Sequence, residues 1–257
     1  MPLSLYFSWH TPEAFTTEFV ELFSAAEIFF VEYGYDSGLV EYHERLYNEL
    51  SKGKKTPQQL AKLMSDPLTD TALYHALFEM ISGRGKAVYL ERSPLTVSEV
   101  VQMLTIEFKA VDLDKNLRAY KKKLAERADC EKRRDVSFAR QLRECCETNP
   151  GREILVMRGA MHQRGLERFL RSEDVKFTSH LSHNPLPMDT QTEILSRLEI
   201  GEDVNRRELL MALVESIELK RRGYDPKTLK IAELVEIQNA LAELSEKDLE
   251  RYFGPGQ

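Results

Sequence analysis

Two short apolar segments near the N-terminus, with one amphipathic segment between them, constrain the fold most. Residues 4–9 are rich in aromatic side chains and end at His10, and residues 28–31 form a continuous apolar run that ends at Glu32. A helix is predicted to begin between them at Thr11, which is followed by proline and glutamate. A strand, a helix and a strand in so short a span require parallel strands. His10 and Glu32 are therefore expected at the same edge of one sheet.

Three later segments extend this sheet. Residues 87–90 and 154–157 are short apolar runs, and residues 175–181 alternate less regularly between apolar and polar side chains. Helical patterns separate all of these segments. The pattern predicts an α/β fold (α+β by strict count) with a central, largely parallel sheet of about four to five strands flanked by helices.

The remaining sequence is helical and highly charged. Residues 97–148 form a long charged region, in which residues 115–134 are expected to project as a helical hairpin. Apolar spacing returns from Val136, which predicts that this part docks on the sheet. We therefore expect an α/β domain over residues 1–184, with a helical insertion at about 95–148. Residues 185–257 are expected to be a helical extension that packs on this domain or makes a subunit contact.

Composition excludes several classes of protein. Hydrophobic residues make up 42% of the chain, charged residues 30%, and the formal net charge is -6. This balance offers no basic surface for nucleic acid. The sequence has no signal-peptide pattern and no apolar run near the ~20 residues of a membrane span. Three cysteines do not make a disulfide framework. A cytoplasmic protein without nucleic-acid or membrane partners is expected.

Four residues with useful chemistry follow predicted strands. His10, Glu32 and Glu91 come directly after strands, and His162 follows the strand 154–157 by one turn. Ligands of open α/β sheets bind at this carboxyl edge. Two imidazoles and one or two carboxylates suit a divalent metal with open positions for water, whose pKa the metal lowers towards ~7. A spare carboxylate, Glu32 or Glu91, would then accept the water's proton.

Each of these residues also has a structural explanation. A histidine after a strand is often a buried structural residue, Glu32 could cap the following turn, and Glu91 could pair with Arg92. Arg134 could hold a substrate oxygen or orient a site carboxylate with its two-pronged guanidinium. It could equally be a surface charge in a charged segment.

The ordered set of segments resembles a known family. It is similar to the TraB/PrgY and TIKI group, part of a wider superfamily with the erythromycin esterases and ChaN. The resemblance covers about residues 4–181. The matching segments are residues 6–10, 29–32, 88–92, Arg134 with Asp135, and Gly159 to His162 with Gly165 and Leu166.

The resemblance implies a function and a set of ligands. TIKI-like members imply a metal-dependent peptidase, in which the counterparts of His10, His162 and Glu32 serve the metal. ChaN-like members imply iron or haem handling, and the esterase branch implies ester hydrolysis led by a histidine and a glutamate. The chain departs from the pattern at Phe7, which replaces the first motif's glycine, and at Glu91, where aspartate is more usual.

Three functional hypotheses follow. The first is a metal-dependent hydrolase of a small-molecule or peptide substrate, with His10, Glu32 and His162 holding a Mn, Co or Zn ion. In it, Glu32, Glu91 and Arg134 are the catalytic residues. The second is a non-catalytic regulatory protein that keeps the fold and binds a ligand, a metal or haem. The third is an interaction protein that acts through residues 115–134 and the C-terminal helices, which could also form a homo-oligomer.

Overall fold

The chain forms two compact units. The computed structural model describes residues 3–9, 12–33, 38–64, 72–96, 99, 112–184, 188–223 and 231–253. The first unit comprises Met1–Val97 and Arg133–Leu186, and the second comprises Ser98–Lys132 and Pro187–Gln257. Residues 98–132 thus group with the C-terminal helices, although the sequence suggested an insertion of the α/β domain.

A five-stranded parallel sheet forms the centre of the first unit, as counted in the described part of the chain. Its order is β3-β2-β4-β1-β5. The carboxyl ends of β1 and β4 are level, since Ser8 pairs with Gly159, and β2 ends two residues earlier, since Val31 pairs with Met157. The predicted α/β class with a parallel sheet is confirmed. The strands are β1 (Leu3–Ser8), β2 (Ile28–Val31), β3 (Ala87–Leu90), β4 (Ile154–Gly159) and β5 (Thr178–Leu181).

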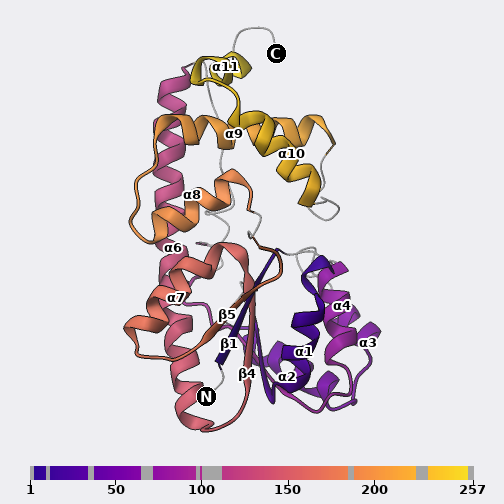
Figure 1. Ribbon diagram of the computed structural model, residues 1–257. Coiled ribbons are helices and arrows are strands. Elements are labelled where there is room, and N and C mark those ends of the chain that lie inside the picture. The colour runs from indigo at the N-terminus through magenta and orange to yellow at the C-terminus, as the bar shows by residue number, and fades with distance from the viewer. Residues whose placement is uncertain are drawn as a thin grey trace. The chain divides into compact units, whose positions relative to one another are not determined.

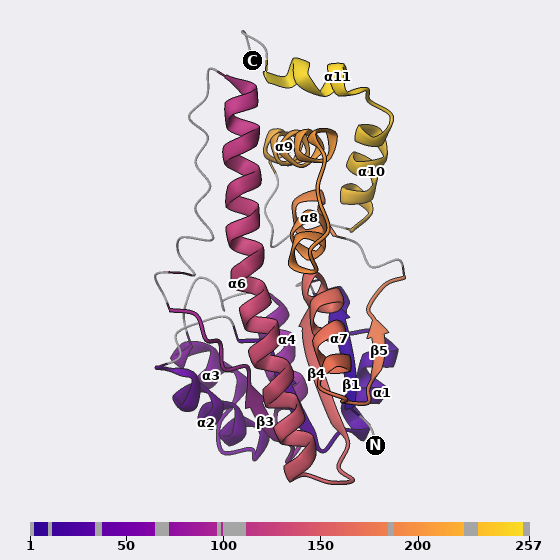
Figure 2. The same ribbon diagram turned by 90° about the vertical axis from the view of Figure 1, so that its left-hand side faces the viewer.

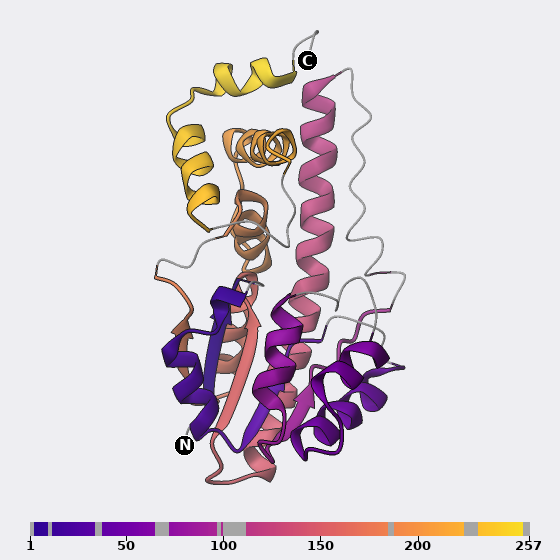
Figure 3. The same cartoon turned by 90° about the vertical axis from the view of Figure 1, so that its right-hand side faces the viewer.

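Helices cover both faces of this sheet (Figure 1). One face lies against α1 (Thr17–Ala25), α2 (Val40–Ser51), α3 (Pro57–Leu63) and α4 (Ala72–Ile81), drawn in indigo and purple in Figure 3. The other face lies against α6 (Leu113–Thr148), from Arg133 onward, and α7 (Gln163–Ser172), which face the viewer in Figure 2. Short 3-10 turns at Pro12–Ala14 and Ala160–His162 follow β1 and β4.

Side chains alternate between two apolar cores because successive residues of a strand point to opposite faces. The first core lies on the α1–α4 face, and its members include Tyr6, Phe29, Val31, Leu77, Leu155 and Met157. The second core lies on the α6–α7 face, and its members include Leu5, Phe7, Phe30, Phe138, Val156 and Leu166.

The first helix begins later than the sequence indicated. Thr16 is the N-cap, and its side chain accepts a hydrogen bond from the Phe19 amide. The Tyr6 hydroxyl donates to the Ala14 carbonyl at 2.9 Å and lies 2.7 Å from Thr16 Oγ1. This buried tyrosine thereby secures the turn before the helix. Thr11, the predicted start, lies outside the described residues.

Helix α6 corrects the predicted hairpin. Residues 113–148 form one continuous helix of 36 residues, and residues 100–111 lie outside the described part of the chain. The physical reason is that this segment contains no glycine or proline before Asn149-Pro150-Gly151. Its later part docks on the sheet as predicted, because Ala139, Leu142 and Cys146 belong to the second core.

The second unit is helical, in agreement with its sequence pattern. Asp189, Asn205 and Ser245 each cap a helix with their side chain. The predicted third helix divides at Ser245. No helix among the described residues is both long and apolar enough to cross a bilayer. The helices are α8 (Thr190–Glu199), α9 (Arg206–Arg221), α10 (Ile231–Ala242) and α11 (Glu246–Glu250), followed by a 3-10 turn at Arg251–Phe253.

Side chains of α2 cover the open edge of strand β3. Asn48 Nδ2 donates to the Val88 carbonyl at 2.6 Å, and Asn48 Oδ1 accepts from the Val88 amide at 3.1 Å. Glu44 accepts from the Leu90 amide, and Ser51 donates to the Lys86 carbonyl. Because the three residues lie on one helical face, they replace the missing neighbouring strand.

We predict that Asn48→Ala lowers the free energy of unfolding by about 1–2 kcal/mol, because it removes both hydrogen bonds to Val88. The control is Glu49→Ala on the same helix, which removes only an ion pair with Lys55 at the surface and should cost less than about 0.5 kcal/mol. Urea denaturation of both variants measures the difference. Equal losses would show that α2 does not stabilise this edge.

Candidate functional site

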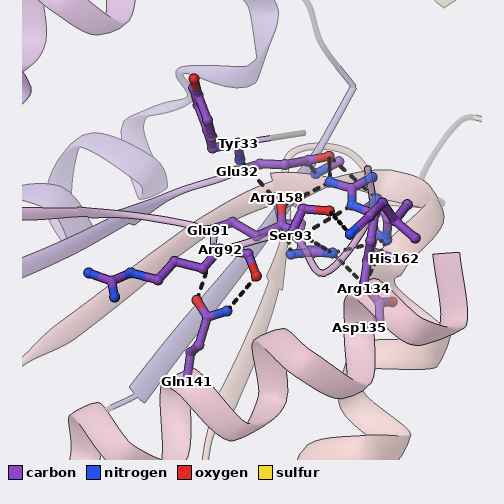
Figure 4. A network of polar contacts seen from close by, with 12 residues as sticks. Glu32, Tyr33, Glu91, Arg92, Ser93, Arg134, Asp135, Gln141, Arg158 and His162 are labelled. Carbon is purple, nitrogen blue, oxygen red and sulfur yellow. Dashed lines mark hydrogen bonds and ion pairs between the residues drawn. The ribbon is translucent and has the colours of Figure 1, made fainter. Parts of the chain in front are cut away.

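Charged side chains gather at the carboxyl edge of the sheet, within the first unit (Figure 4). Glu32 and Glu91 follow the neighbouring strands β2 and β3 directly, and the Glu91 amide donates to the Val31 carbonyl at 3.1 Å. Helix α6 supplies Arg134 and Asp135, strand β4 supplies Arg158, and the 3-10 turn after β4 supplies His162. We call this set the charge cluster: Glu32, Glu91, Arg134, Asp135, Arg158 and His162.

Two guanidiniums enclose the Glu91 carboxylate. Arg134 donates to Oε1 from Nε at 3.1 Å and to Oε2 from Nη2 at 2.9 Å. Arg158 places Nη2 3.3 Å from Oε1 and Nη1 3.3 Å from Oε2. Glu91 is completely buried. Its oxygens are therefore committed to holding the two arginines.

Arg158 is the largest fully buried side chain of the described structure. It lies in β4, and its guanidinium stacks on the Phe138 ring with 4.5 Å to the ring centroid. Besides Glu91, it makes a short ion pair with Asp135. A buried cation is costly unless it is paired, so the Glu91 and Asp135 carboxylates stabilise Arg158 whether or not a ligand is bound.

His162 lies between two carboxylates. Its Nδ1 is 2.9 Å from Asp135 Oδ1, and its Nε2 is 3.4 Å from Glu32 Oε1. The ring is buried at the start of α7. Because Nδ1–H donates to Asp135, a neutral ring would have its lone pair on Nε2, directed to the side of Glu32.

Opposing effects set the charge of His162. Burial and the Arg158 guanidinium lower the pKa of the ring. The carboxylates of Asp135 and Glu32 raise it by a larger amount, so that the net pKa is about 10. Without a bound cation the imidazole is therefore protonated at neutral pH, so it cannot act there as a base.

Glu32 is the most accessible carboxylate of the cluster. Its side chain is 16% exposed, whereas those of Glu91 and Asp135 are fully buried. Glu32 Oε2 accepts from the Gly159 amide at 2.6 Å, and Oε1 lies 3.4 Å from both Arg134 Nη2 and His162 Nε2. These contacts fix the carboxylate while keeping it within reach of solvent.

The cluster offers donor atoms that suit a metal ion. The Asp135 carboxylate and the His162 imidazole belong to a buried group whose ligand atoms lie within 4.8 Å of one another and could hold a metal. The three carboxylates and two guanidiniums of the cluster leave one surplus negative charge, which the His162 proton balances. Imidazole nitrogen with carboxylate oxygen is a donor set for Zn, Mn or Co. A carboxylate on the other ring nitrogen is a common support for a metal-binding histidine.

The structure brings together four of the five predicted site residues: Glu32, Glu91, Arg134 and His162. The fifth, His10, lies outside the described residues. Glu91 does not pair with Arg92, whose guanidinium lies 4.0 Å from Glu44. Arg134 is buried rather than a surface charge, and it orients Glu91 and Glu32.

Sequence reasoning missed Arg158 and the role of Asp135. Arg158 follows the apolar run 154–157 and resembles the first polar residue after a strand, yet β4 continues to Gly159. An arginine at the end of such a run, directly before glycine-x-x-histidine, was the available signal. Phe7, which replaces the first motif's glycine, packs in the second core.

Comparisons with protein-family models, with curated proteins and with solved structures found no match. The site therefore has to be interpreted from its own geometry.

We predict that Glu91→Gln lowers the free energy of unfolding by about 3 kcal/mol, because it leaves two buried guanidiniums with one carboxylate fewer. Combining Glu91→Gln with Arg158→Met should cost less than the sum of the single changes. The control is Glu27→Gln, whose partner Arg152 is half exposed, and its loss should stay under about 1 kcal/mol. Chemical denaturation of the two single variants, the double variant and the control measures the losses in free energy of unfolding. If the losses of the two single variants simply add in the double variant, the pairing of Glu91 with Arg158 is contradicted.

We predict that His162 stabilises the metal-free protein in a pH-dependent way. Because its pKa in the folded chain, about 10, exceeds the ordinary 6.5, its contribution is complete below about pH 6.5 and is lost as the pH rises through 10. With chelator present, the stability difference between the natural chain and His162→Gln should therefore shrink between pH 6.5 and 10. His180→Gln, a change to a histidine outside the cluster, serves as control. A difference that grows with pH would contradict this sign.

Proposed function

We propose that this chain is a metal-dependent hydrolase of ester or amide bonds, and that it belongs to the TraB/TIKI-like group. The observation that carries the proposal is the position of His162 Nε2, 3.4 Å from Glu32 Oε1, while Asp135 holds the opposite ring nitrogen. That separation suits two ligands of one ion. The raised pKa of the imidazole keeps the ring protonated at neutral pH, so it does not serve as a metal-free general base, and an ion that binds Nε2 has to displace that proton.

His162 and Glu32 would hold the ion, and His10 is a further candidate from the sequence. Asp135 would keep the His162 ring in its ligand orientation. When bound, a divalent ion supplies Lewis acidity for a carbonyl oxygen and makes water more acidic. The sequence suggested Glu91 as a base. Its carboxylate oxygens accept hydrogen bonds from Arg134 and Arg158, which supports a role in positioning these two guanidiniums.

Glu32 is the residue best placed to move a proton. Its carboxylate is the most accessible of the cluster, and the Gly159 amide fixes its orientation. With Oε1 assigned to the ion, Oε2 of Glu32 would accept the proton that the attacking water loses and return it to the leaving alcohol or amine. Arg134, which contacts both Glu32 and Glu91, would keep this carboxylate in place.

We predict one divalent ion per chain when protein freed of metal by chelation is titrated with Zn, Mn or Co and followed by calorimetry. His162→Ala and Glu32→Gln should weaken binding by more than about 100-fold, and Asp135→Asn by about 10–100-fold, as expected for a supporting residue. His180→Ala is the matched control, because this ring also bonds a carboxylate, Glu18, at 2.8 Å but lies outside the cluster.

Turnover is tested with the same proteins, using nitrophenyl esters and N-acetyl peptides as substrates. The metal-loaded natural chain should hydrolyse one of these classes, and His162→Ala should lose at least about 100-fold in kcat/KM. Absence of stoichiometric binding would contradict the metal site. Binding with no turnover of either class would instead support the non-catalytic alternative.

A further inference from the structure

A small pocket lies beside the charge cluster, between the sheet and α4. Its walls come from the ends of β1, β2 and β4 and from α4, all within the first unit. It lies on the face opposite α6, because Val31 and Met157 belong to the first core. Glu32 lines it as well, so that one carboxylate borders both the pocket and the cluster. Its lining residues include Ser8, Val31, Glu32, Leu73, Leu77 and Met157.

Ser8 is the unusual member of this pocket. It ends β1, is fully buried, and lies on the same face as Tyr6, two residues earlier. Its Oγ has no hydrogen-bond partner among the residues that the structure describes. A buried hydroxyl without a partner costs free energy. The rest of the wall is mainly apolar, with Glu32 and Arg158 as its charged members, and the Ser8 hydroxyl is suited to a polar atom supplied by a ligand.

The size of the pocket limits that ligand. Its free volume is about 20 Å³, which exceeds the roughly 10–15 Å³ needed for one water-sized group but leaves no room for a long chain. A methyl group with a polar atom next to it matches both the apolar wall and Ser8.

We propose that this pocket is an acyl subsite that selects acetyl or comparably short acyl groups, with Ser8 Oγ–H donating to the acyl oxygen. The inference rests on the proposed hydrolase and names its substrate class: acetyl esters or amides. In that reaction the water oxygen bonds to the acyl carbon, and the bond from this carbon to the alcohol or amine breaks. The proton that water gives up leaves with that alcohol or amine.

The experiment follows the Met157 methyl group by NMR in protein labelled with 13C-methyl methionine, using Met157→Leu to identify the signal. Unreacted N-methylacetamide and N-methylhexanamide are the probes, so the measurement needs neither metal nor turnover. N-methylacetamide should shift the signal to saturation. N-methylhexanamide should bind at least about tenfold more weakly, because the pocket cannot take added methylenes.

Three variants define the contacts. Ser8→Ala should weaken N-methylacetamide binding by about five- to tenfold, while its melting temperature stays equal or rises, because an unsatisfied hydroxyl is removed. Leu77→Phe should fill the pocket and abolish binding. Leu63→Phe, the same change at an exposed position of α3, should bind normally. If Leu77→Phe does not fold, Ser8→Ala decides.

The outcomes separate this inference from the proposed function. The subsite is overturned if neither amide shifts the Met157 signal. It is also overturned if N-methylacetamide binds Ser8→Ala as tightly as it binds the natural chain. Amide binding with these preferences but no hydrolysis of any ester keeps the subsite and removes the hydrolase. Hydrolysis with equal kcat/KM for acetyl and hexanoyl esters, unchanged in Ser8→Ala, keeps the hydrolase and removes the subsite.

Discussion

The buried guanidinium of Arg158 is the interaction on which the site depends. It lies at the carboxyl end of the central strand β4, where water cannot solvate it, and so it requires carboxylates from neighbouring elements. Glu91 comes from the end of β3 and Asp135 from α6. By binding both, Arg158 ties the sheet edge to the helix that covers it. The same Asp135 oxygen orients His162, so the structural ion pair also positions the chemically capable ring.

Glu32 connects two environments of different character. On the α6 side it contacts Arg134 and His162, where charge is balanced among buried groups. On the α4 side it borders a small, mainly aliphatic pocket that contains the Ser8 hydroxyl. A hydrolase needs a place for a polar reacting centre next to a place for the substrate's apolar part. The carboxyl edge of the sheet provides both places, because Glu32 lies there between the charge cluster on the α6 side and the pocket on the α4 side.

The sequence was sufficient for the sheet and for most of the site. Apolar runs at 28–31 and 87–90 match β2 and β3 in full, and parallel topology then places Glu32 and Glu91 together. The start of α1 was wrong because Thr11-Pro12 resembles a helix start, whereas the Tyr6 hydroxyl, a tertiary contact, fixes the turn before Thr16. Arg158 was missed for a similar reason: its burial depends on Phe138 and Asp135, which are distant in sequence.

A crystal structure of the protein grown with Co or Zn ions, recorded at the metal's absorption edge, tests the central claim most directly. The account predicts one anomalous peak at about 2.0–2.2 Å from both His162 Nε2 and a Glu32 oxygen, with Asp135 still bonded to Nδ1. An ion bound elsewhere, or no peak in the cluster at saturating metal, would contradict it. His162 would then be a buried imidazolium that serves only the charge balance of Arg158 and its carboxylates.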